Sequence, residues 1–329
     1  MMKIGVIGTN WITDTLVEAS KDVPSVTIEA VCSRTMEKAT EFAGKHSIPY
    51  CFTSIKEMCE SKKIDGVYIA TPNAVHHEQA IECLEAGIAV LCEKPLTATY
   101  TLAEQMVQTS RKNGVLLMEA MKSTVMPNFQ RVQELLPELG TIRQYSAHYG
   151  QYSSRYDKFK NGVIENAFKP ELSNGSLMDL GVYTLYPLVA LFGVPEEVKA
   201  ISTPLHTGVD GQGMVLLSYT EMDAVITYSK ITNSYMPTEI AGEKAALHIS
   251  QISSPERVTR ITKENGSEDL SVAQEKAPMA YELEEFARAY QNGQIESSIN
   301  THELSLNVIA LMQSIRQQIG VLYPLDELS

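Results

Sequence analysis

Short apolar runs alternate with amphipathic segments over residues 2–119. The apolar runs have the length of strands, and the segments between them repeat apolar residues at helical spacing. We expect strands over Met2–Ile7, Val26–Cys32, Gly66–Ala70, Ile88–Cys92 and Val115–Glu119. We expect helices over Thr35–His46, Ser54–Cys59, Val75–Ala86 and Thr101–Asn113. Strands that alternate with helices predict an α/β fold with a doubly wound parallel sheet of the Rossmann type.

The pattern changes after Met121. A helix over Pro127–Leu136 is followed by strand-like runs, several of them without helices between them, which favours a mainly antiparallel, open sheet. These runs are Ile142–Tyr152, Val198–Thr203, Met214–Tyr219, Ala224–Lys230 and Ala245–Gln251, and helices over Ala280–Asn292 and Thr301–Ile319 close the chain. We therefore expect two domains, a Rossmann domain over residues 1–121 and an α+β domain over residues 122–329.

A large sheet with helices on one face leaves its other face to be covered. Pairing with the same sheet of a second subunit would cover that face. The sequence thus predicts a homodimer or homotetramer formed through the C-terminal sheet.

The composition is that of a soluble globular protein, with 44% hydrophobic and 20% charged residues among 329. A formal net charge of −13 argues against a nucleic-acid partner and against an anionic membrane surface. The chain opens without a signal-peptide pattern, and the longest nearly apolar stretch, Leu185–Val194, is too short to span a bilayer. We expect a cytoplasmic protein.

Cysteine and histidine spacing gives no sign of a metal site. The five cysteines lie in the first third of the chain without C-x-x-C spacing, which predicts free buried thiols in a reducing compartment. No H-E-x-x-H motif or cysteine–histidine cluster occurs, so no metal is expected.

The turn after the first strand resembles a dinucleotide-binding fingerprint only in part. Of the three glycines of G-x-G-x-x-G, the segment Gly8-Thr9-Asn10-Trp11-Ile12-Thr13 keeps the first. Asn10 can adopt a left-handed conformation in place of the second glycine. A plain strand–helix turn is the alternative, but the position at the first strand favours a cofactor site.

The end of the second strand indicates which coenzyme is bound. An NAD site usually has an acidic residue here for the ribose 2′-hydroxyl, whereas an arginine accommodates a 2′-phosphate. Residues 31–35 contain no acid but include Ser33 and Arg34, which favours NADP. The alternative is that these two residues are a helix cap and a solvated surface charge.

Two further turns follow predicted strands at the same edge of the sheet. Thr71-Pro72-Asn73 caps the next helix or faces the cofactor, and His76 is expected to face the cleft. Glu93-Lys94-Pro95 places a lysine where open α/β sheets bind their ligands. Its ammonium can be desolvated there and can stabilise a developing alkoxide.

A mostly apolar helix beginning near Ser176 and running to about Phe192 carries an acid and a phenol. Residues 173–176, Ser-Asn-Gly-Ser, are expected to cap it. Asp179 and Tyr183 have i, i+4 spacing, so they lie on one face. A buried carboxylate needs a partner, which would be a substrate hydroxyl, Lys94 or backbone donors. A hydrogen-bond network without chemistry is the alternative to an acid–base site.

These segments together resemble the Gfo/Idh/MocA oxidoreductase family over nearly the whole length of the chain. The resemblance rests on G-V-I-G at 5–8, T-P-N-A-V-H at 71–76, E-K-P at 93–95, E-A at 119–120 and N-G-S-L-M-D-L-G-V-Y at 174–183. The segments I-A-G-E-K-A-A-L at 240–247 and Y-E-L-E-E-F-A at 281–287 are similar to the family's C-terminal domain. Many members have histidine where Tyr183 stands, and the tyrosine form resembles the dihydrodiol dehydrogenase and glucose–fructose oxidoreductase branches.

The resemblance implies a role for each matching position. Residues Gly8 to Ile12 would approach the pyrophosphate, Ser33 and Arg34 the adenosine end, and Thr71, Asn73, Glu93 and Lys94 the nicotinamide half. Lys94 and Tyr183 would take part in proton transfer, with Asp179 orienting the substrate. Asn10, Asn174 and Asn166-Ala167 depart from the family pattern, and so does Glu119-Ala120-Met121-Lys122-Ser123-Thr124-Val125.

We therefore expect reversible hydride transfer between NAD(P) and a carbon bearing a hydroxyl or carbonyl in a sugar, polyol or cyclic diol. Tyr183 would accept the hydroxyl proton with Lys94 nearby, or Lys94 would itself be the base. Two other functions known in this family are possible: a regulator that senses NAD(P) without catalysis, and an enzyme that cleaves glycosides with transient use of NAD.

Overall fold

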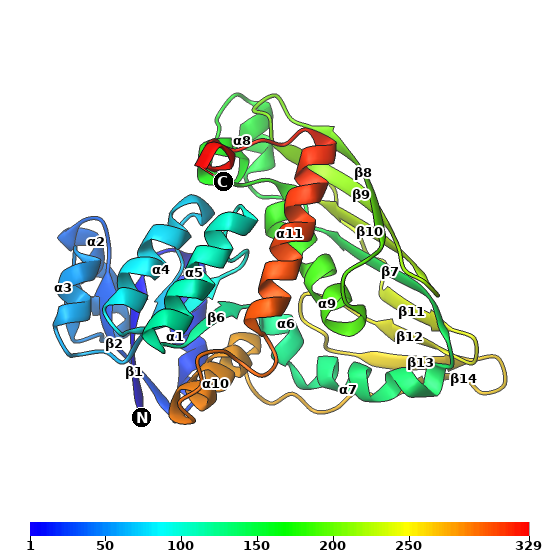
Figure 1. Ribbon diagram of the computed structural model, residues 1–329, viewed down its shortest axis with the longest axis horizontal. Helices are drawn as coiled ribbons and strands as arrows, with labels where there is room; N and C mark the ends of the chain where they lie inside the picture. The colour runs from blue at the N-terminus through cyan, green and yellow to red at the C-terminus, as the bar shows by residue number, and fades with distance from the viewer. Residues whose placement is uncertain (329) are drawn as a thin grey trace. The chain divides into compact units, whose positions relative to one another are not determined.

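The computed structural model describes residues 1–328 and divides into two compact units (Figure 1). The first unit consists of Met1–Lys122 and Lys276–Leu306, and the second of Ser123–Glu275 and the residues from Asn307 onward. The sequence pattern predicts residues 276–306 in the second domain. They pack instead with the first unit, because α10 (Pro278–Gln291) lies against α1 (Trp11–Ala19) and β2 (Val26–Cys32).

The first unit contains a six-stranded parallel sheet in the order β3-β2-β1-β4-β5-β6. Its strands are β1 (Met2–Ile7), β2, β3 (Tyr50–Phe52), β4 (Gly66–Ile69), β5 (Ala89–Glu93) and β6 (Leu117–Ala120). Its helices include α1, α2 (Met36–His46), α3 (Ile55–Glu60), α4 (His76–Glu85), α5 (Tyr100–Asn113) and α10. From β1 the chain adds β2 and β3 on one side of the sheet, and then adds β4, β5 and β6 on the other side of β1. The carboxyl ends of β1 and β4 therefore form the switch point at which such sheets bind ligands. The predicted doubly wound fold is confirmed.

Strand burial explains which strands the sequence predicted. Every residue of β4, β5 and β6 is buried, so each strand is an apolar run, interrupted only by Glu93 in β5 and Glu119 in β6. Strand β3 is three half-buried residues long. It is too short to produce a periodic signal and was not predicted.

The second unit is built on an eight-stranded sheet in the order β14-β13-β12-β11-β7-β10-β9-β8. Its strands are β7 (Ile142–Gly150), β8 (Glu197–Pro204), β9 (Asp210–Ser218), β10 (Asp223–Ser229), β11 (Thr238–Gly242), β12 (Ala246–Ile249), β13 (Val258–Thr262) and β14 (Gly266–Asp269). Neighbouring strands are antiparallel except β10 and β7, which are parallel. The predicted mainly antiparallel sheet is confirmed, although β11, β13 and β14 were not predicted.

Helices cover one face of this sheet. The π-helical turn η6 (Leu177–Gly181) continues into α9 (Val182–Phe192), and both pack on β7 and β10 (Figure 1). The other helices are α6 (Lys122–Val125), α7 (Pro127–Leu135), α8 (Tyr156–Lys160) and α11 (His302–Ile319), which begins in the first unit. Alternate residues of β7 and β10, such as Tyr145 and Ile226, are buried beneath η6 and α9.

The opposite face of the sheet carries exposed apolar side chains. Ile201 of β8 is 68% exposed, and Met214 and Leu216 of β9 are 52% and 58% exposed. Ile201 and Met214 are directly paired across the two strands. These three residues form an apolar patch, which we call the outer-face patch.

Residues Pro170–Phe192 are long and apolar enough to cross a membrane, but 72% of their apolar window is buried inside the protein. A helix whose apolar residues are buried against its own sheet is typical of the core of a globular protein.

All five cysteines are free thiols, as predicted, and all but Cys51 are buried. The sulfur atoms of Cys59 and Cys83 approach to 3.8 Å without a disulfide.

Candidate active site

The predicted cofactor residues lie along one edge of the first sheet. Gly8 follows β1, Ser33 follows β2, Thr71 follows β4, and Lys94 follows β5. Because these strands are parallel and ordered β2-β1-β4-β5, their carboxyl ends place the four residues at one edge, in the order Ser33, Gly8, Thr71, Lys94.

Gly8 is required by close backbone packing. Its φ is +106°, and a Cβ at this position would lie 2.7 Å from the carbonyl oxygen of Ala70. No other residue fits there without moving the end of β4. At Gly8 the turn after β1 therefore carries no side chain, which allows a phosphate to approach the backbone at that residue.

Asn10 has a different role from the one expected. Its φ is −94° and its ψ is 178°, so it is extended and not left-handed. Its side-chain oxygen accepts hydrogen bonds from the amides of Ile12 (2.9 Å) and Thr13 (3.2 Å). Its amide group also donates to the carbonyl of Ala70 at 2.6 Å. Asn10 thus caps α1 and ties the turn after β1 to the end of β4, and the next residue, Trp11, is exposed.

Ser33 and Arg34 are accessible at the end of β2. Arg34 is exposed and Ser33 half-buried. The helix cap that Ser33 could have supplied is supplied by Thr35, which accepts from the amide of Lys38. Ser33 is therefore not a helix cap, whereas the exposure of Arg34 agrees with either reading of that residue.

His76 is a buried structural residue, contrary to the expectation that it faces a cleft. It is fully buried, and its ring nitrogens lie 2.9 Å from the carbonyl of Thr71 and 3.2 Å from that of Pro95. Burial lowers the pKa of its imidazole. His76 therefore packs between the Thr71 turn and the Glu93–Pro95 turn, and in its neutral form it donates to one of these two carbonyls at a time.

Acidic residues surround the base of Lys94 within the first unit. Glu93 is nearly buried and accepts a hydrogen bond from the hydroxyl of Tyr68 at 2.5 Å. Glu282 of α10 is 1% exposed and interacts electrostatically with Glu93, Lys94 and Lys122. Burial raises the pKa of both carboxyl groups. Sequence reasoning missed Glu282, because it lies on an otherwise ordinary amphipathic helix.

Glu119 is a third buried acid in this unit. It accepts hydrogen bonds from the amide of Leu96 at 2.9 Å and from the hydroxyl of Ser305. Burial raises the pKa of Glu119 to about 7.

In the second unit, Asp179 and Tyr183 lie on η6 and the first turn of α9. The prediction that residues 173–176 cap this helix is wrong, because none of their side chains caps the start of η6. Instead both carboxylate oxygens of Asp210, at the start of β9, accept from the amides of Ser176 (3.0 Å) and Leu177 (2.8 Å). The ring of Tyr183 packs edge-on against that of Tyr149, with centroids 5.6 Å apart.

Asp179 forms an ion pair with a lysine that the sequence did not predict as its partner. The ammonium of Lys230, the residue after β10, lies 2.6 Å from Oδ2 of Asp179. The side chain of Asp179 is 42% exposed, whereas that of Lys230 is 5% exposed. The helix η6–α9 thus presents a carboxylate whose counter-ion comes from the sheet on which the helix packs.

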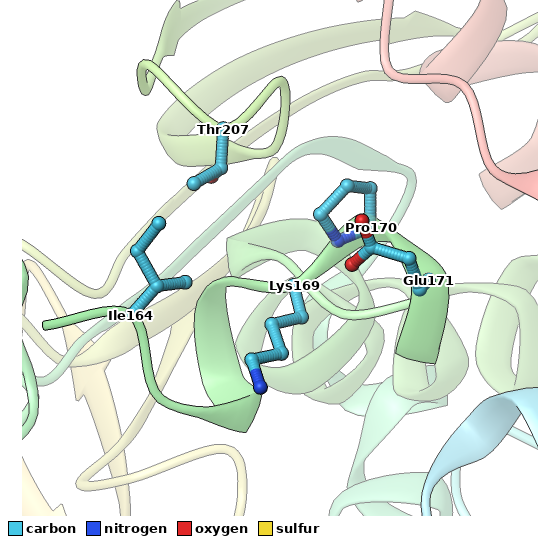
Figure 2. Close-up of a pocket in the computed structure, with 5 residues that line it drawn as sticks. All are labelled: Ile164, Lys169, Pro170, Glu171 and Thr207. Atoms are coloured by element: carbon cyan, nitrogen blue, oxygen red, sulfur yellow. The ribbon is translucent and has the colours of Figure 1, made fainter.

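A pocket of about 280 Å³ lies elsewhere in the second unit (Figure 2). Ile164, Lys169, Pro170, Glu171 and Thr207 line it, the last from the turn between β8 and β9. These five residues include no predicted catalytic side chain, so we assign the pocket no role in the reaction. Among residues 1–328, no group of three or more histidine, cysteine or acidic side chains is placed to hold a metal ion.

Profiles of known families match both parts of the chain. Residues 2–121 match the oxidoreductase family with an NAD-binding Rossmann fold, and residues 129–248 match the GFO/IDH/MocA C-terminal domain.

Individual relatives extend over the whole chain. Scyllo-inositol 2-dehydrogenase (NADP(+)) IolU of Bacillus subtilis (strain 168) is 46% identical over 327 residues, which cover 99% of this chain and 100% of the relative. Trans-1,2-dihydrobenzene-1,2-diol dehydrogenase of Xenopus tropicalis is 29% identical, with 98% and 99% covered. A 3-ketoreductase of Actinomadura kijaniata, solved with NADP and TDP-benzene, has the same fold with a TM-score of 0.86 at 23% identity, covering 98% of this chain and 99% of that one. The chain therefore belongs to the Gfo/Idh/MocA family of oxidoreductases, as its motifs indicated.

Proposed function

We propose that this protein catalyses reversible hydride transfer between NADP and a carbon bearing a hydroxyl or carbonyl, with a cyclic polyol as the first candidate within the sugars, polyols and cyclic diols. The observation that carries the proposal is the helix η6–α9. It presents the carboxylate of Asp179 and the phenol of Tyr183 from adjacent turns. A carboxylate that binds hydroxyls beside a group that transfers a proton suits alcohol oxidation. The relative that is 46% identical is a scyllo-inositol 2-dehydrogenase, which supports an inositol as substrate.

The first unit supplies the coenzyme residues in this proposal. Gly8, Thr9, Asn10, Trp11 and Ile12 contact the pyrophosphate, and Ser33 and Arg34 bind the 2′-phosphate. Thr71, Pro72, Asn73, Glu93 and Lys94 contact the nicotinamide half, and His76 holds two of these turns in place. The bare backbone at Gly8 and the exposed guanidinium of Arg34 fit such a ligand. When bound, NADP supplies the hydride acceptor.

Tyr183 takes the hydroxyl proton of the substrate in the oxidation direction. Lys94 stabilises the oxygen as negative charge develops on it, because an ammonium in a desolvated site favours an alkoxide. Lys94 acting as the base, with Tyr183 positioning the hydroxyl, is the alternative assignment. Asp179 accepts a hydrogen bond from the substrate and orients it.

The same proposal includes a cytoplasmic location and a homodimer or homotetramer. Five free thiols are typical of a reducing compartment. The outer-face patch of Ile201, Met214 and Leu216 is the surface through which we expect subunits to pair.

Turnover of a substrate panel tests the function. Inositols, sugars and cyclic diols are incubated with NADP or NAD, and the absorbance of the reduced nicotinamide is followed. Tyr183→Phe is compared with Tyr290→Phe, a control on the surface of α10. We expect Tyr183→Phe to lower kcat by about 100- to 10,000-fold with unchanged NADP affinity. We expect the control to behave as the wild type.

Two results would argue against the proposal. Near-normal kcat in Tyr183→Phe would remove the phenol from proton transfer. A protein that binds NADP but turns over none of these substrates in either direction would not be a polyol dehydrogenase.

A further inference from the structure

Lys230 is a buried cation whose place in the chain gives no hint of a function. It directly follows β10, where a lysine is usually a solvated strand end. Here the residue is 4% exposed, and its ammonium lies 2.6 Å from Oδ2 of Asp179 and 5.8 Å from the ring centroid of Phe168. Lys230 therefore has a carboxylate on one side and an aromatic face on another.

The backbone of Lys230 is fixed as firmly as its side chain. Its amide donates to the carbonyl of Gly211 at 2.9 Å, and its carbonyl accepts from the amide of Ser153 at 2.8 Å. Gly211 adjoins Asp210, which caps η6 and interacts electrostatically with Lys230. The strand pair β9–β10 thus holds both the start of the reacting helix and the counter-ion of its acid.

The side chains of Lys230 and Asp179 differ in solvent exposure, and a contribution of the ion pair to folding stability does not explain this difference. Burying an ammonium costs free energy that a single ion pair often fails to recover, so a buried pair is weak evidence for a stabilising role. In this pair the lysine is hidden, whereas 42% of the Asp179 side chain remains accessible. A ligand arriving at η6 therefore meets the carboxylate and not the ammonium.

We propose that Lys230 is a positioning residue that determines specificity for substrates with a second hydroxyl beside the reacting one. It holds the carboxylate of Asp179 in one orientation, and this carboxylate accepts a hydrogen bond from that neighbouring hydroxyl. An acceptor fixed in this way favours a vicinal diol over an analogue that lacks the hydroxyl, because the analogue cannot make this hydrogen bond. This inference rests on the proposed function, since it concerns the substrate of the same site.

Lys230→Met tests the inference, because methionine keeps much of the side-chain length without the charge. The matched control is Lys230→Arg, which keeps the charge. KM and kcat are measured for the preferred polyol and for its deoxy analogue lacking one neighbouring hydroxyl. We expect Lys230→Met to raise KM for the polyol by about 10- to 100-fold. For the analogue we expect a change of less than about 3-fold, and Lys230→Arg should recover most of the loss.

A double-variant comparison separates positioning from folding. Asp179→Asn alone should weaken polyol binding as Lys230→Met does, and adding Lys230→Met to it should change KM little, because the lysine acts through the acid. The neutral pair also avoids an unpaired charge if Lys230→Met alone does not fold. Equal KM increases for polyol and analogue, or additive effects of the two substitutions, would overturn the inference.

Binding without turnover separates this inference from the proposed function. Polyol affinity is measured by calorimetry on the NADP-loaded wild type and Lys230 variants. Unchanged polyol affinity in Lys230→Met would overturn the role of Lys230, whether or not the wild type turns the polyol over. A wild type whose polyol affinity depends on Lys230 but that does not oxidise the polyol would reject the function alone.

Discussion

The carboxylate of Asp210 fills the space beside Gly175: a Cβ at residue 175 would collide with Oδ1 of Asp210. From this position Asp210, which is fully buried, accepts hydrogen bonds from the amides of Ser176 and Leu177. The glycine of the N-G-S-L motif is therefore needed to admit a cap from β9. The helix that carries Asp179 and Tyr183 begins at a point that this cap determines.

Gly175→Ala should destabilise the second unit, because the methyl group displaces the capping carboxylate. Loss of two charge-assisted bonds to buried amides is expected to lower the free energy of unfolding by about 2–4 kcal/mol. Thermal unfolding measures this, with Gly44→Ala as control. Gly44 lies inside α2 with no atoms near an added Cβ, so alanine should raise stability by about 0.5–1 kcal/mol. An unfolding temperature for Gly175→Ala at or above that of the wild type would contradict this account.

The fold could be predicted because its main signals are local in the chain. Strands β4 and β5 are buried on both faces and give continuous apolar runs, and the predicted helix Ser54–Cys59 is found as α3 with Ser54 as its cap. The short or half-exposed strands β3, β11, β13 and β14 lack such a signal, because solvent on one side removes the need for apolar residues.

The sequence could nominate candidate site residues only where a single local motif contains them. Lys94, Asp179 and Tyr183 belong to recognisable segments, but the residues that hold them do not. Lys230 and Asp210 reach η6 through tertiary contacts from β10 and β9, which no spacing rule reveals. Asn10 was misjudged because a missing glycine suggested a left-handed residue, whereas its side chain is engaged as a helix cap.

Arg34→Ala should change coenzyme preference. We expect KM for NADP to rise by about 10- to 100-fold, since a charge-assisted contact to the 2′-phosphate is lost. KM for NAD should change little. Comparing kcat/KM for both coenzymes measures this, with Lys112→Ala as a control that removes an exposed charge at the end of α5. A strong preference for NAD in the wild type, unaffected by Arg34→Ala, would reverse the coenzyme assignment.

Glu119 should make the first unit less stable as pH rises. Its pKa is raised from the usual 4.5 to about 7 by burial, so the folded state binds a proton that the unfolded state has lost between these values. The stabilisation is complete below about pH 4.5 and is lost as pH rises to about 7. It amounts to at most about 3 kcal/mol.

Glu119→Gln should remove this part of the pH dependence. The variant keeps an acceptor for the amide of Leu96 but cannot titrate. We expect the unfolding temperature to fall less between pH 5 and pH 8 in the variant than in the wild type. Glu85→Gln, an exposed position on α4, should follow the wild type. Parallel curves for Glu119→Gln and the wild type would show that Glu119 does not titrate as described.

Leu216→Glu should dissociate the proposed oligomer. Leu216 is 58% exposed on the outer face of β9, beside Met214 and Ile201, and η6 and α9 pack on the opposite face of the sheet. A carboxylate in a buried apolar interface would lack a partner, so its desolvation opposes pairing. Light scattering after size exclusion should show a smaller species with the fold unchanged by circular dichroism. Val272→Glu, an exposed apolar position outside the strands, is the control and should leave the mass unchanged. A wild type that is monomeric at micromolar concentration, or a Leu216→Glu oligomer of unchanged mass, would mean that this face does not pair subunits.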